Sequence, residues 1–445
     1  MRAALLTLTV LASGFPAAAS AEPVLLISID GLRPGEVIEA EQRGLKIPNL
    51  RRFLKEGAYA TGVTGVLPTV TYPSHATLLT GASPGRHGIV NNTTFDPTQT
   101  NQGGWYWYAR DTRVPTLWSA AAGAGIGVGN VHWPVSVDAA GVRWNLPQLW
   151  RTGHEDDRKL VAALASPGLV GALETALKEP YAQGIDESLA GDENRGRFAV
   201  EMIRRHRPGF ITVYLTAFDH EQHVEGPDTP AAHAVLERID AIVGRLIAAQ
   251  QAAHRDGVIA VASDHGFLPV TRELNLFRAF IDAGLIKIGG DGKIASWEAM
   301  PWPSGGSIAV ALARPEDAAL VARVSALLQR LQGDPANGIA RLADATQIAA
   351  QRANPRASFY LELAPGTMAA GYSGPAAPLL APSRYKGMHG YFPDNPAMRS
   401  TFMLMGKGVP RARSLGEIDM RAIAPTLARI LKVKLEGAEV PAVQF

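Results

Sequence analysis

Three short apolar runs along the chain share one layout. Each is rich in Val, Ile and Leu and leads into an acidic residue: PVLLISIDG (23–31), FITVYLTAFDHEQH (210–223) and VIAVASDHG (258–266). Continuous apolar runs of this length predict strands that are buried on both faces. Apolar residues at helical spacing lie between them, over 193–205 and 231–253. This alternation predicts an α/β fold with a mostly parallel central sheet and helices on both faces.

The acidic residues in these runs fall where α/β sheets bind ligands. In an open sheet of this kind, sites form outside the carboxyl ends of the strands. We therefore expect Asp30, Asp219 and Asp264 to meet at one rim of the sheet, although they are far apart in the sequence.

Residues 267 to 382 have a more mixed pattern. The predicted elements are a loop over 297–306 (WEAMPWPSGG), a strand over 307–313, a helix started by Pro315 and a strand over 358–364. The chain then returns to a histidine motif and to a terminal helix near 420–432. We predict one catalytic domain over 22–445, with an inserted α+β subdomain at about 267–382.

Histidines accompany the three carboxylates. His223 follows the second carboxylate by four residues, His265 adjoins the third, and His389 lies between two glycines in KGMHGYF. Carboxylates and imidazoles suit zinc or a similar divalent ion, and six ligands exceed one tetrahedral site. The pattern indicates a two-metal centre for phosphoryl transfer. His220 is an alternative to His223, and each motif taken singly also fits a turn or a helix cap.

The stretch TVTYPSHATLLTG (69–81) places hydroxyl groups next to a helix. Pro73 is typical of a first helical residue and Gly81 of a stop, so Thr71 is expected just before the helix N-terminus. The unpaired N–H groups there favour a phosphate or a developing alkoxide. Ligation to a divalent ion would activate the hydroxyl by lowering its pKa. The open alternatives are a capping role for Thr71 and, as competing nucleophiles, Thr69 and Thr77.

Composition excludes several classes of function. The chain has 445 residues, of which 47% are hydrophobic, so it can bury a large core. Its 43 basic and 41 acidic residues nearly balance, so we expect no stable complex with nucleic acid. The absence of cysteine from the sequence excludes disulfides, thiolate metal sites and cysteine nucleophiles.

The N-terminal residues resemble a signal peptide. Over 1–21, Arg2 supplies a positive charge, 4–15 an apolar stretch and 19–21 a small-residue cleavage pattern. We expect a mature chain from Glu22 that is periplasmic or secreted; the alternative is an N-terminal anchor helix. No later apolar stretch reaches about 18 residues, so no transmembrane anchor is expected.

Five motifs in order carry a family resemblance: SIDGLRP, LPTVTYPSHATLLTGASPGRHGIVNN, FDHEQH, ASDHGF and GMHGYF. Together they resemble the nucleotide pyrophosphatase/phosphodiesterase (type I phosphodiesterase) branch of the alkaline phosphatase superfamily. The resemblance implies two zinc ions. One would be held by Asp30, Thr71, Asp264 and His265, and the other by Asp219, His223 and His389.

The resemblance also implies roles around the nucleophile. Thr71 matches the residue that forms a phosphothreonine intermediate. Asn92 matches an asparagine that, with the Thr71 amide, contacts a nonbridging phosphate oxygen; otherwise it is a turn residue beside Asn91. Tyr72 matches an aromatic residue that stacks on a nucleobase; otherwise it packs in the core. Ser74 stands where relatives often carry Asn, so the resemblance does not define the details of the leaving-group pocket.

These observations predict an exported two-metal phosphodiesterase or nucleotide pyrophosphatase that acts on a small phosphodiester or nucleotide. A phosphomonoesterase of the same superfamily is the first alternative. It would need a basic side chain to neutralise the additional charged oxygen of a monoester, and Arg384 and Lys386 are the candidates. A non-catalytic metal-binding relative is the second. Sulfatase chemistry fits less well. Sulfatases use a cysteine or serine in a C/S-x-P-x-R pattern, whereas this chain has Thr71 as the hydroxyl residue and His75 where the arginine is expected.

Overall fold

The computed structural model describes residues 21–98, 104–150 and 156–445. Its central sheet has the strand order β19-β2-β18-β7-β1-β6-β4-β5. The parallel part comprises β7 (Val258–Ala262), β1 (Val24–Ile29), β6 (Phe210–Leu215), β4 (Val128–Val131) and β5 (Trp144–Leu146). The other edge comprises the antiparallel pairs of β18 (Phe402–Gly406) with β7 and β2 (Ala58–Tyr59), and β19 (Arg413–Ser414). The predicted mostly parallel sheet is confirmed.

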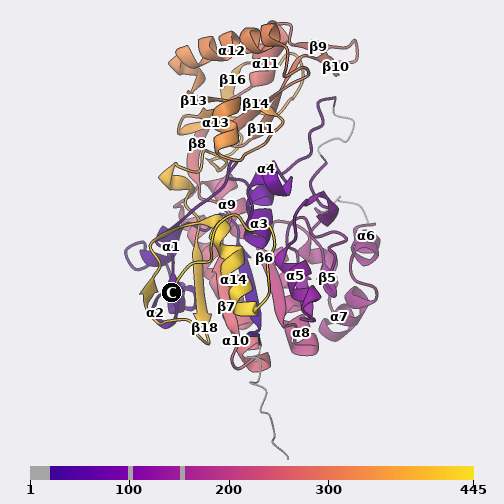
Figure 1. The fold of residues 1–445 in the computed structure, drawn as a ribbon, viewed down its shortest axis with the longest axis vertical. Helices are drawn as coiled ribbons and strands as arrows, with labels where there is room; N and C mark the ends of the chain where they lie inside the picture. The colour runs from indigo at the N-terminus through magenta and orange to yellow at the C-terminus, as the bar shows by residue number, and fades with distance from the viewer. Residues whose placement is uncertain (1–20, 99–103, 151–155) are drawn as a thin grey trace, which may run out of the picture.

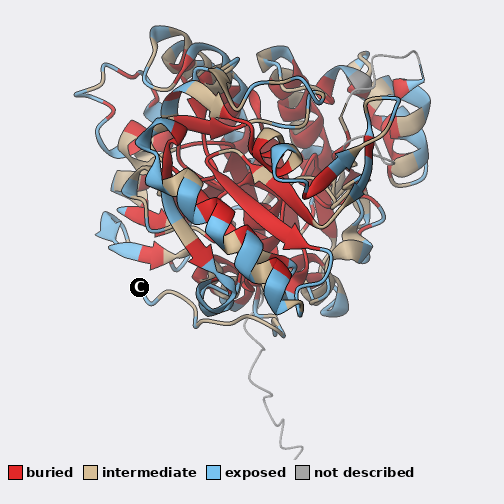
Figure 2. Ribbon diagram, turned by 90° about the horizontal axis from the view of Figure 1, so that it is seen from above, coloured by how far each residue is buried: buried red, intermediate tan, exposed pale blue. Residues whose placement is uncertain are grey.

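Helices cover both faces of this sheet (Figure 1). Alternate residues of a strand point to opposite faces, so Leu25 and Ile27 pack in a different core cluster from Val24 and Leu26. The first face is covered by α2 (Pro48–Glu56), α8 (Leu189–His206) and α10 (Pro230–Ala253). The second is covered by α3 (Thr71–Thr80), α5 (Leu117–Gly123) and α14 (Ile423–Leu431). Figure 2 shows the sheet strands buried between these layers.

A second lobe sits at the top of Figure 1, in orange. Its sheet has the order β11 (Ala299–Ser304), β12 (Ser307–Leu312), β14 (Ala357–Leu363) and β13 (Ile339–Asp344). Its other elements are α11 (Leu276–Asp282), α12 (Ala318–Gly333), α13 (Ala345–Ala350) and the pair β9 (Ile286–Ile288) and β10 (Ile294–Trp297). The lobe has its own hydrophobic cluster. The division of the chain at 267 and 382 stays a prediction.

Two expectations for this lobe were wrong. The segment predicted as a loop over 297–306 contains strand β11, in which Pro301 pairs with Val310. Its prolines are tolerated because β11 is at the edge of its sheet, where an N–H is not needed for a second neighbour. Helix α12 begins at Ala318 rather than at Pro315, because the Asp317 carboxylate accepts the N–H groups of Ala319 and Leu320 and caps the helix.

A small sheet joins the two lobes beside the rim. Strand β8 (Leu268–Leu274) leaves β7 and pairs with β15 (Gly366–Ala369), β16 (Leu380–Pro382) and β17 (Gly387–Met388). The pairing of β17 with β8 returns the chain to the carboxyl end of β7 just before His389. This connection places a distant histidine at the rim.

The remaining described elements are short or peripheral: α1 (Pro34–Ile38), β3 (Gly62–Thr64), α4 (Pro84–His87), α6 (Asp157–Leu164), α7 (Leu169–Leu177), α9 (Ala217–Glu225) and β20 (Glu417–Asp419), besides short 3-10 turns. The expected signal peptide lies outside the described residues, apart from Ala21. Within the described part of the chain, no helix is both long and apolar enough to cross a membrane.

Candidate metal centre

The carboxyl ends of three neighbouring parallel strands carry the predicted carboxylates. Asp30 follows β1, Asp219 lies in the first turn of α9 after β6, and Asp264 follows β7. With the histidines they form two groups, and within each group the ligand atoms lie within 4.8 Å of one another. The first group is Asp30, Asp264 and His265, and the second is Asp219, His223 and His389.

The first group is centred on His265 Nε2. This atom lies 3.3 Å from Asp30 Oδ1 and 3.1 Å from Asp264 Oδ2. The Thr71 hydroxyl is 3.5 Å from the same nitrogen. All of these side chains are buried, so the group is held in a protein environment rather than in bulk solvent.

The second group is centred on Asp219. Its Oδ2 lies 3.3 Å from His223 Nε2, and its Oδ1 lies 3.8 Å from His389 Nε2. The rings of His389 and His265 stack with centroids 3.6 Å apart, so the two groups adjoin. His220, the alternative ligand, instead contacts Glu187 at 3.3 Å with 46% of its side chain exposed.

Backbone carbonyls orient all three histidine rings in the same way. The Nδ1 atoms lie against the carbonyl oxygens of Gly387 (2.9 Å, from His223), Thr69 (3.2 Å, from His389) and Gly266 (3.3 Å, from His265). A ring that donates through Nδ1 leaves Nε2 free as a ligand, which is the usual arrangement of metal-binding histidines.

Each of the three carboxylates has one oxygen without a hydrogen-bond partner. Asp30 Oδ1, Asp219 Oδ1 and Asp264 Oδ2 are buried without a hydrogen-bond partner. Burial raises the pKa of Asp30 well above its usual range, and the charges of Asp219 and Asp264 add to this. Three ionised carboxylates in this space therefore need compensating positive charge. The residues present fit two divalent cations.

The other two carboxylates are held ionised by their histidines. Burial opposes the charge of Asp264, but His265 and His75 outweigh it and lower its pKa. Burial likewise opposes the charge of Asp219, whose pKa His223 and His389 lower. The histidines thus prepare both carboxylates to accept a cation.

Helix α3 begins at Thr71, two residues earlier than the sequence predicted, with Val70 as its cap residue. Proline is tolerated here at the third position because the first N–H groups of a helix have no intrahelical partner. The expected stop is correct, since Gly81 is left-handed with φ 66°. The competing hydroxyls point elsewhere: Thr69 donates to the Tyr391 carbonyl at 2.6 Å, and Thr77 contacts His87 at 3.1 Å.

Asn92 lies at the N-terminus of α3. Its Oδ1 accepts the Tyr72 N–H at 2.9 Å, and its own N–H donates to Asn91 Oδ1 at 2.7 Å. Tyr72 has none of its side chain exposed and packs against Trp105 with ring centroids 5.2 Å apart. Its hydroxyl has no hydrogen-bond partner. A stacking role for Tyr72 stays a prediction.

Sequence reasoning missed a set of supporting side chains. His75 contacts the Thr71 carbonyl through Nδ1 and Ser28 Oγ through Nε2, both at 2.8 Å. The Tyr214 hydroxyl donates to Asp30 Oδ2. The four-residue spacing of Thr71 and His75 was a usable signal, whereas Tyr214 looked like any residue of an apolar strand.

Replacing Tyr214 with phenylalanine is expected to weaken divalent-metal affinity by about tenfold, because the donor that favours ionised Asp30 is lost. The loss should grow as pH falls, since a proton then competes better for Asp30. Competition with a chromophoric chelator measures the affinity. Tyr181→Phe is the matched control, because that buried hydroxyl has no partner. Equal losses in both variants would contradict the role of Tyr214.

A buried ion pair anchors the start of α9. The Asp192 carboxylate accepts the N–H groups of Thr216 and Ala217, both at 2.9 Å, and pairs with Arg195. Arg195 also donates to the Gly184 carbonyl at 2.5 Å and to Thr216 Oγ1 at 2.7 Å. Neither charged side chain is exposed. This pair fixes the turn that carries Asp219.

Asp192→Ala is expected to lower the free energy of unfolding by about 3–5 kcal/mol, because it leaves Arg195 buried and unpaired. Urea denaturation followed by circular dichroism measures it. Glu39→Gln removes a surface pair with Arg43 and should change stability by about 0.5 kcal/mol or less. A similarly small effect of Asp192→Ala would rule out the anchoring role.

Two glycines allow close backbone approaches at the rim. Gly31 has φ 66° and donates its N–H to Asp264 Oδ1 at 3.2 Å. Gly390, beside His389, has φ 90°, and a Cβ there would lie 1.9 Å from the Ser304 carbonyl. Because Gly390 has no Cβ, the backbone of the second lobe can pack directly against the residue that follows His389.

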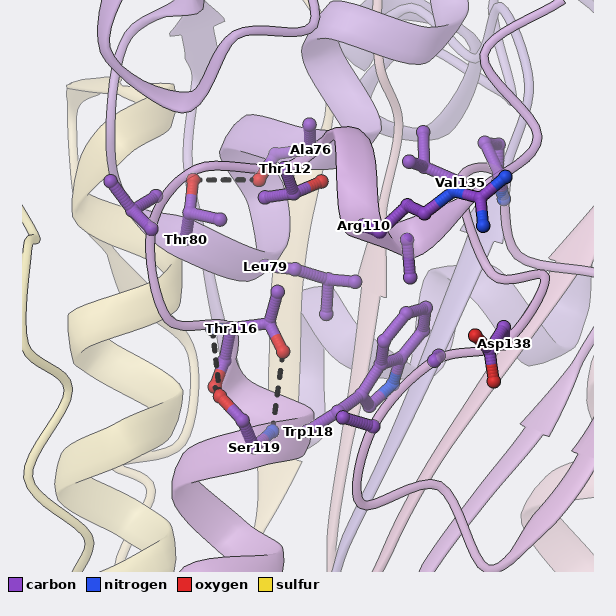
Figure 3. A pocket seen from close by; sticks show the side chains of 15 residues that line it. Ala76, Leu79, Thr80, Arg110, Thr112, Thr116, Trp118, Ser119, Val135 and Asp138 are labelled. Atoms are coloured by element: carbon purple, nitrogen blue, oxygen red, sulfur yellow. Dashed lines mark hydrogen bonds between the residues drawn. The ribbon is translucent and has the colours of Figure 1, made fainter.

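A pocket of about 390 Å³ lies on another side of α3 (Figure 3). Ala76, Leu79 and Thr80 of that helix line it, with Arg110 and Asp138 across from them. It includes none of the six candidate ligands and not Thr71. The candidate chemistry is therefore outside this pocket.

Comparison with known proteins places these observations in a family. The family model for type I phosphodiesterase / nucleotide pyrophosphatase matches residues 24–392. The chain belongs to this family. The match spans most of the chain, and the matched range contains every candidate ligand.

Curated relatives are more distant. The chain is 25% identical over 56% of its length to an uncharacterized pyrophosphatase/phosphodiesterase of Schizosaccharomyces pombe. It has the same identity and coverage with human ectonucleotide pyrophosphatase/phosphodiesterase family member 1, and is 24% identical over 58% to bovine bis(5'-adenosyl)-triphosphatase ENPP4. The matches span 45%, 24% and 51% of those proteins, so the chain covers about half of their length or less.

Solved structures share the fold. Human ENPP5 superposes with a TM-score of 0.65 at 19% identity, covering 94% of this chain and 97% of that one. An inactive threonine-to-alanine variant of murine ENPP5 in complex with AMP gives 0.64 at 18% identity, covering 95% and 96%. The central sheet, its helices and the second lobe thus have the alkaline-phosphatase-like architecture of these proteins.

Proposed function

We propose that this protein is a metal-dependent phosphodiesterase or nucleotide pyrophosphatase that uses Thr71 as its nucleophile. The observation that carries the proposal is the position of the Thr71 hydroxyl, 3.5 Å from His265 Nε2 in the first group of candidate ligands. Family membership supports the same reaction class.

The proposed metal sites use the two groups described above. Asp30, Asp264, His265 and Thr71 would hold one ion, and Asp219, His223 and His389 the other. Zinc is the proposed metal, because imidazole and carboxylate ligands without thiolates suit a borderline divalent ion. When bound, such ions lower the pKa of an adjacent hydroxyl and offset negative charge on the attacking and leaving oxygens.

The protein's own groups would act in two displacements. Thr71 Oγ forms a bond to phosphorus while the bond from phosphorus to the leaving oxygen breaks, which gives a phosphothreonine. Water then attacks the same phosphorus and the bond to Thr71 Oγ breaks. A phosphate monoester leaves, and a proton given up by the water restores the hydroxyl in place of the proton that went to the leaving group in the first displacement. The Asn92 amide and the N–H groups at the start of α3 would bind a nonbridging oxygen.

A small nucleotide or another phosphodiester is the proposed substrate. The name of bovine ENPP4 refers to bis(5'-adenosyl)-triphosphate, and murine ENPP5 is described in complex with AMP. Tyr72 is the proposed contact for a base, although its ring is covered in the present conformation. Export to the periplasm or medium is proposed from the N-terminal residues.

The arrangement of basic residues favours a diester over a monoester. A monoester carries one more charged oxygen, which an arginine or lysine would have to neutralise. Lys386 pairs with Glu225 at 2.7 Å, and Arg384 lies over the Tyr385 ring at 5.1 Å. Both candidate cations are thus exposed, and each has a partner other than Thr71.

Comparing two substrates tests this choice. The zinc-loaded protein is expected to hydrolyse bis-p-nitrophenyl phosphate with a kcat/KM at least about tenfold above that for p-nitrophenyl phosphate. Release of p-nitrophenol reports both reactions. A strong preference for the monoester would support the phosphomonoesterase alternative. Zinc binding without hydrolysis of either substrate would support the non-catalytic one.

A further inference from the structure

A second pocket lies where the two lobes meet. Its volume is about 210 Å³. The wall from the core includes Arg113 and Tyr106, and the wall from the second lobe includes Trp302, Asn354 and Arg356. The described residues that line it include two arginines and no carboxylate. The lining residues therefore carry two positive charges and no negative one.

The buried wall offers hydrogen-bond donors that have no acceptor. Asn354 is 1% exposed, and its Nδ2 has no partner. Its Oδ1 accepts the Arg356 N–H at 3.0 Å, which fixes the amide so that the nitrogen is the free group. The Trp302 Nε1 is also buried without a partner. Unpaired buried donors are costly, so these two groups indicate a missing acceptor.

The arginines complete the pocket at its exposed side. Among the ion pairs between described residues, none includes Arg113 or Arg356. Arg356 lies over the Phe95 ring at 4.9 Å. Arg113 lies against Gly88, where a Cβ would come within 2.9 Å of its Nε. Both guanidiniums are thus held by packing and keep their donors available.

The same charges reach Tyr106. Burial raises the pKa of its hydroxyl and Asp111 adds to this, whereas Arg356 and Arg113 act in the opposite direction. The hydroxyl is therefore neutral at physiological pH, and it lies in the field of both arginines. Phe95, Tyr106 and Trp302 form an aromatic part of the lining.

We propose that this pocket binds the phosphate group of a small anion, either inorganic phosphate or a phosphate monoester. A tetrahedral oxyanion presents several acceptors, which match two guanidiniums, an amide and an indole N–H. Arginine is suited to such groups because its planar fork binds two oxygens at once. The aromatic part of the lining would contact the organic part of a monoester. The bound anion would link the two lobes, since each contributes one arginine.

Equilibrium dialysis of the zinc-loaded full chain with orthophosphate tests the site. Arg113→Gln combined with Arg356→Gln is expected to weaken one class of phosphate site by about tenfold or more. Arg86→Gln is the matched control, because Arg86 is exposed on α4 but does not line the pocket, and it should change nothing. Unchanged affinity and number of sites in the double variant would overturn the proposal.

Asn354→Asp gives a sharper variant. It keeps the oxygen that accepts the Arg356 N–H and replaces only the free donor by a negative oxygen. The same phosphate site should be lost, with the melting temperature of the anion-free protein showing that the variant is folded. If it fails to fold, the exposed arginine variants still decide the question.

Phenylphosphonate separates the two sources of phosphate. Tighter binding than orthophosphate at this site would indicate a monoester, and equal or weaker binding would indicate inorganic phosphate. The proposal does not depend on the reaction at the metal centre. Phosphate bound at the metal centre would be lost in Asp219→Ala and kept in the arginine variants. Failure of the proposed function and failure of the pocket between the lobes are therefore distinguishable.

Discussion

Thr71→Ala is expected to reduce hydrolysis of bis-p-nitrophenyl phosphate by about a thousandfold or more while both metal ions stay bound. The variant loses the hydroxyl and a methyl group, and the carboxylate and histidine ligands remain in their two groups. Steady-state assays of p-nitrophenol release measure turnover, and elemental analysis measures zinc per chain. Loss of activity with zinc retained would separate a nucleophile from a structural ligand.

Thr69→Val is the matched control. It removes a hydroxyl that donates to the Tyr391 carbonyl at 2.6 Å, two residues before the proposed nucleophile. We expect a stability loss of about 1 kcal/mol with turnover largely kept. If Thr69→Val is inactive and Thr71→Ala retains full turnover, the nucleophile is assigned to the wrong threonine.

Alanine variants of one carboxylate from each group should each lose one metal ion. Asp264→Ala removes the carboxylate beside His265. Asp219→Ala removes the carboxylate that lies beside both His223 and His389. Each is expected to lower turnover by about a hundredfold or more, because a two-metal reaction needs both charges. Zinc content after dialysis and anomalous diffraction at the zinc edge show which site is empty.

Asp228→Ala is the control for these variants. The Asp228 side chain is 48% exposed, pairs with Arg33 and Arg43, and belongs to neither group. It should keep both ions and most of the activity. Full zinc content and full turnover in Asp264→Ala would remove the first group as a metal site.

Local patterns were enough to predict the mostly parallel central sheet and the helices on its two faces. The runs around Asp30, Asp219 and Asp264 gave strands because unbroken apolar segments need burial on both faces, and the helices between them followed from their spacing. Strand β11 was missed because its prolines indicate a loop, and only its place at a sheet edge makes them acceptable. The early start of α3 was missed because Val70 caps it without a side-chain signal.

The supporting residues of the site were beyond sequence reasoning. Tyr214 meets Asp30, and Asp192 meets the start of α9, only because strands and helices distant in the sequence pack together. The phosphate pocket is of the same kind, since Arg113 and Arg356 come from different lobes. No spacing along the chain indicates such pairs.

The sequence by itself determined the sheet, the rim and the residue types that meet there, because periodicity and strand ends are local properties of the chain. Tertiary structure decided which neighbours those residues face. It turned His220 outward to Glu187, and it placed the hydroxyl of Thr71, rather than that of Thr69, beside His265. Side-chain direction at a rim depends on packing against segments hundreds of residues away, and no local pattern encodes it.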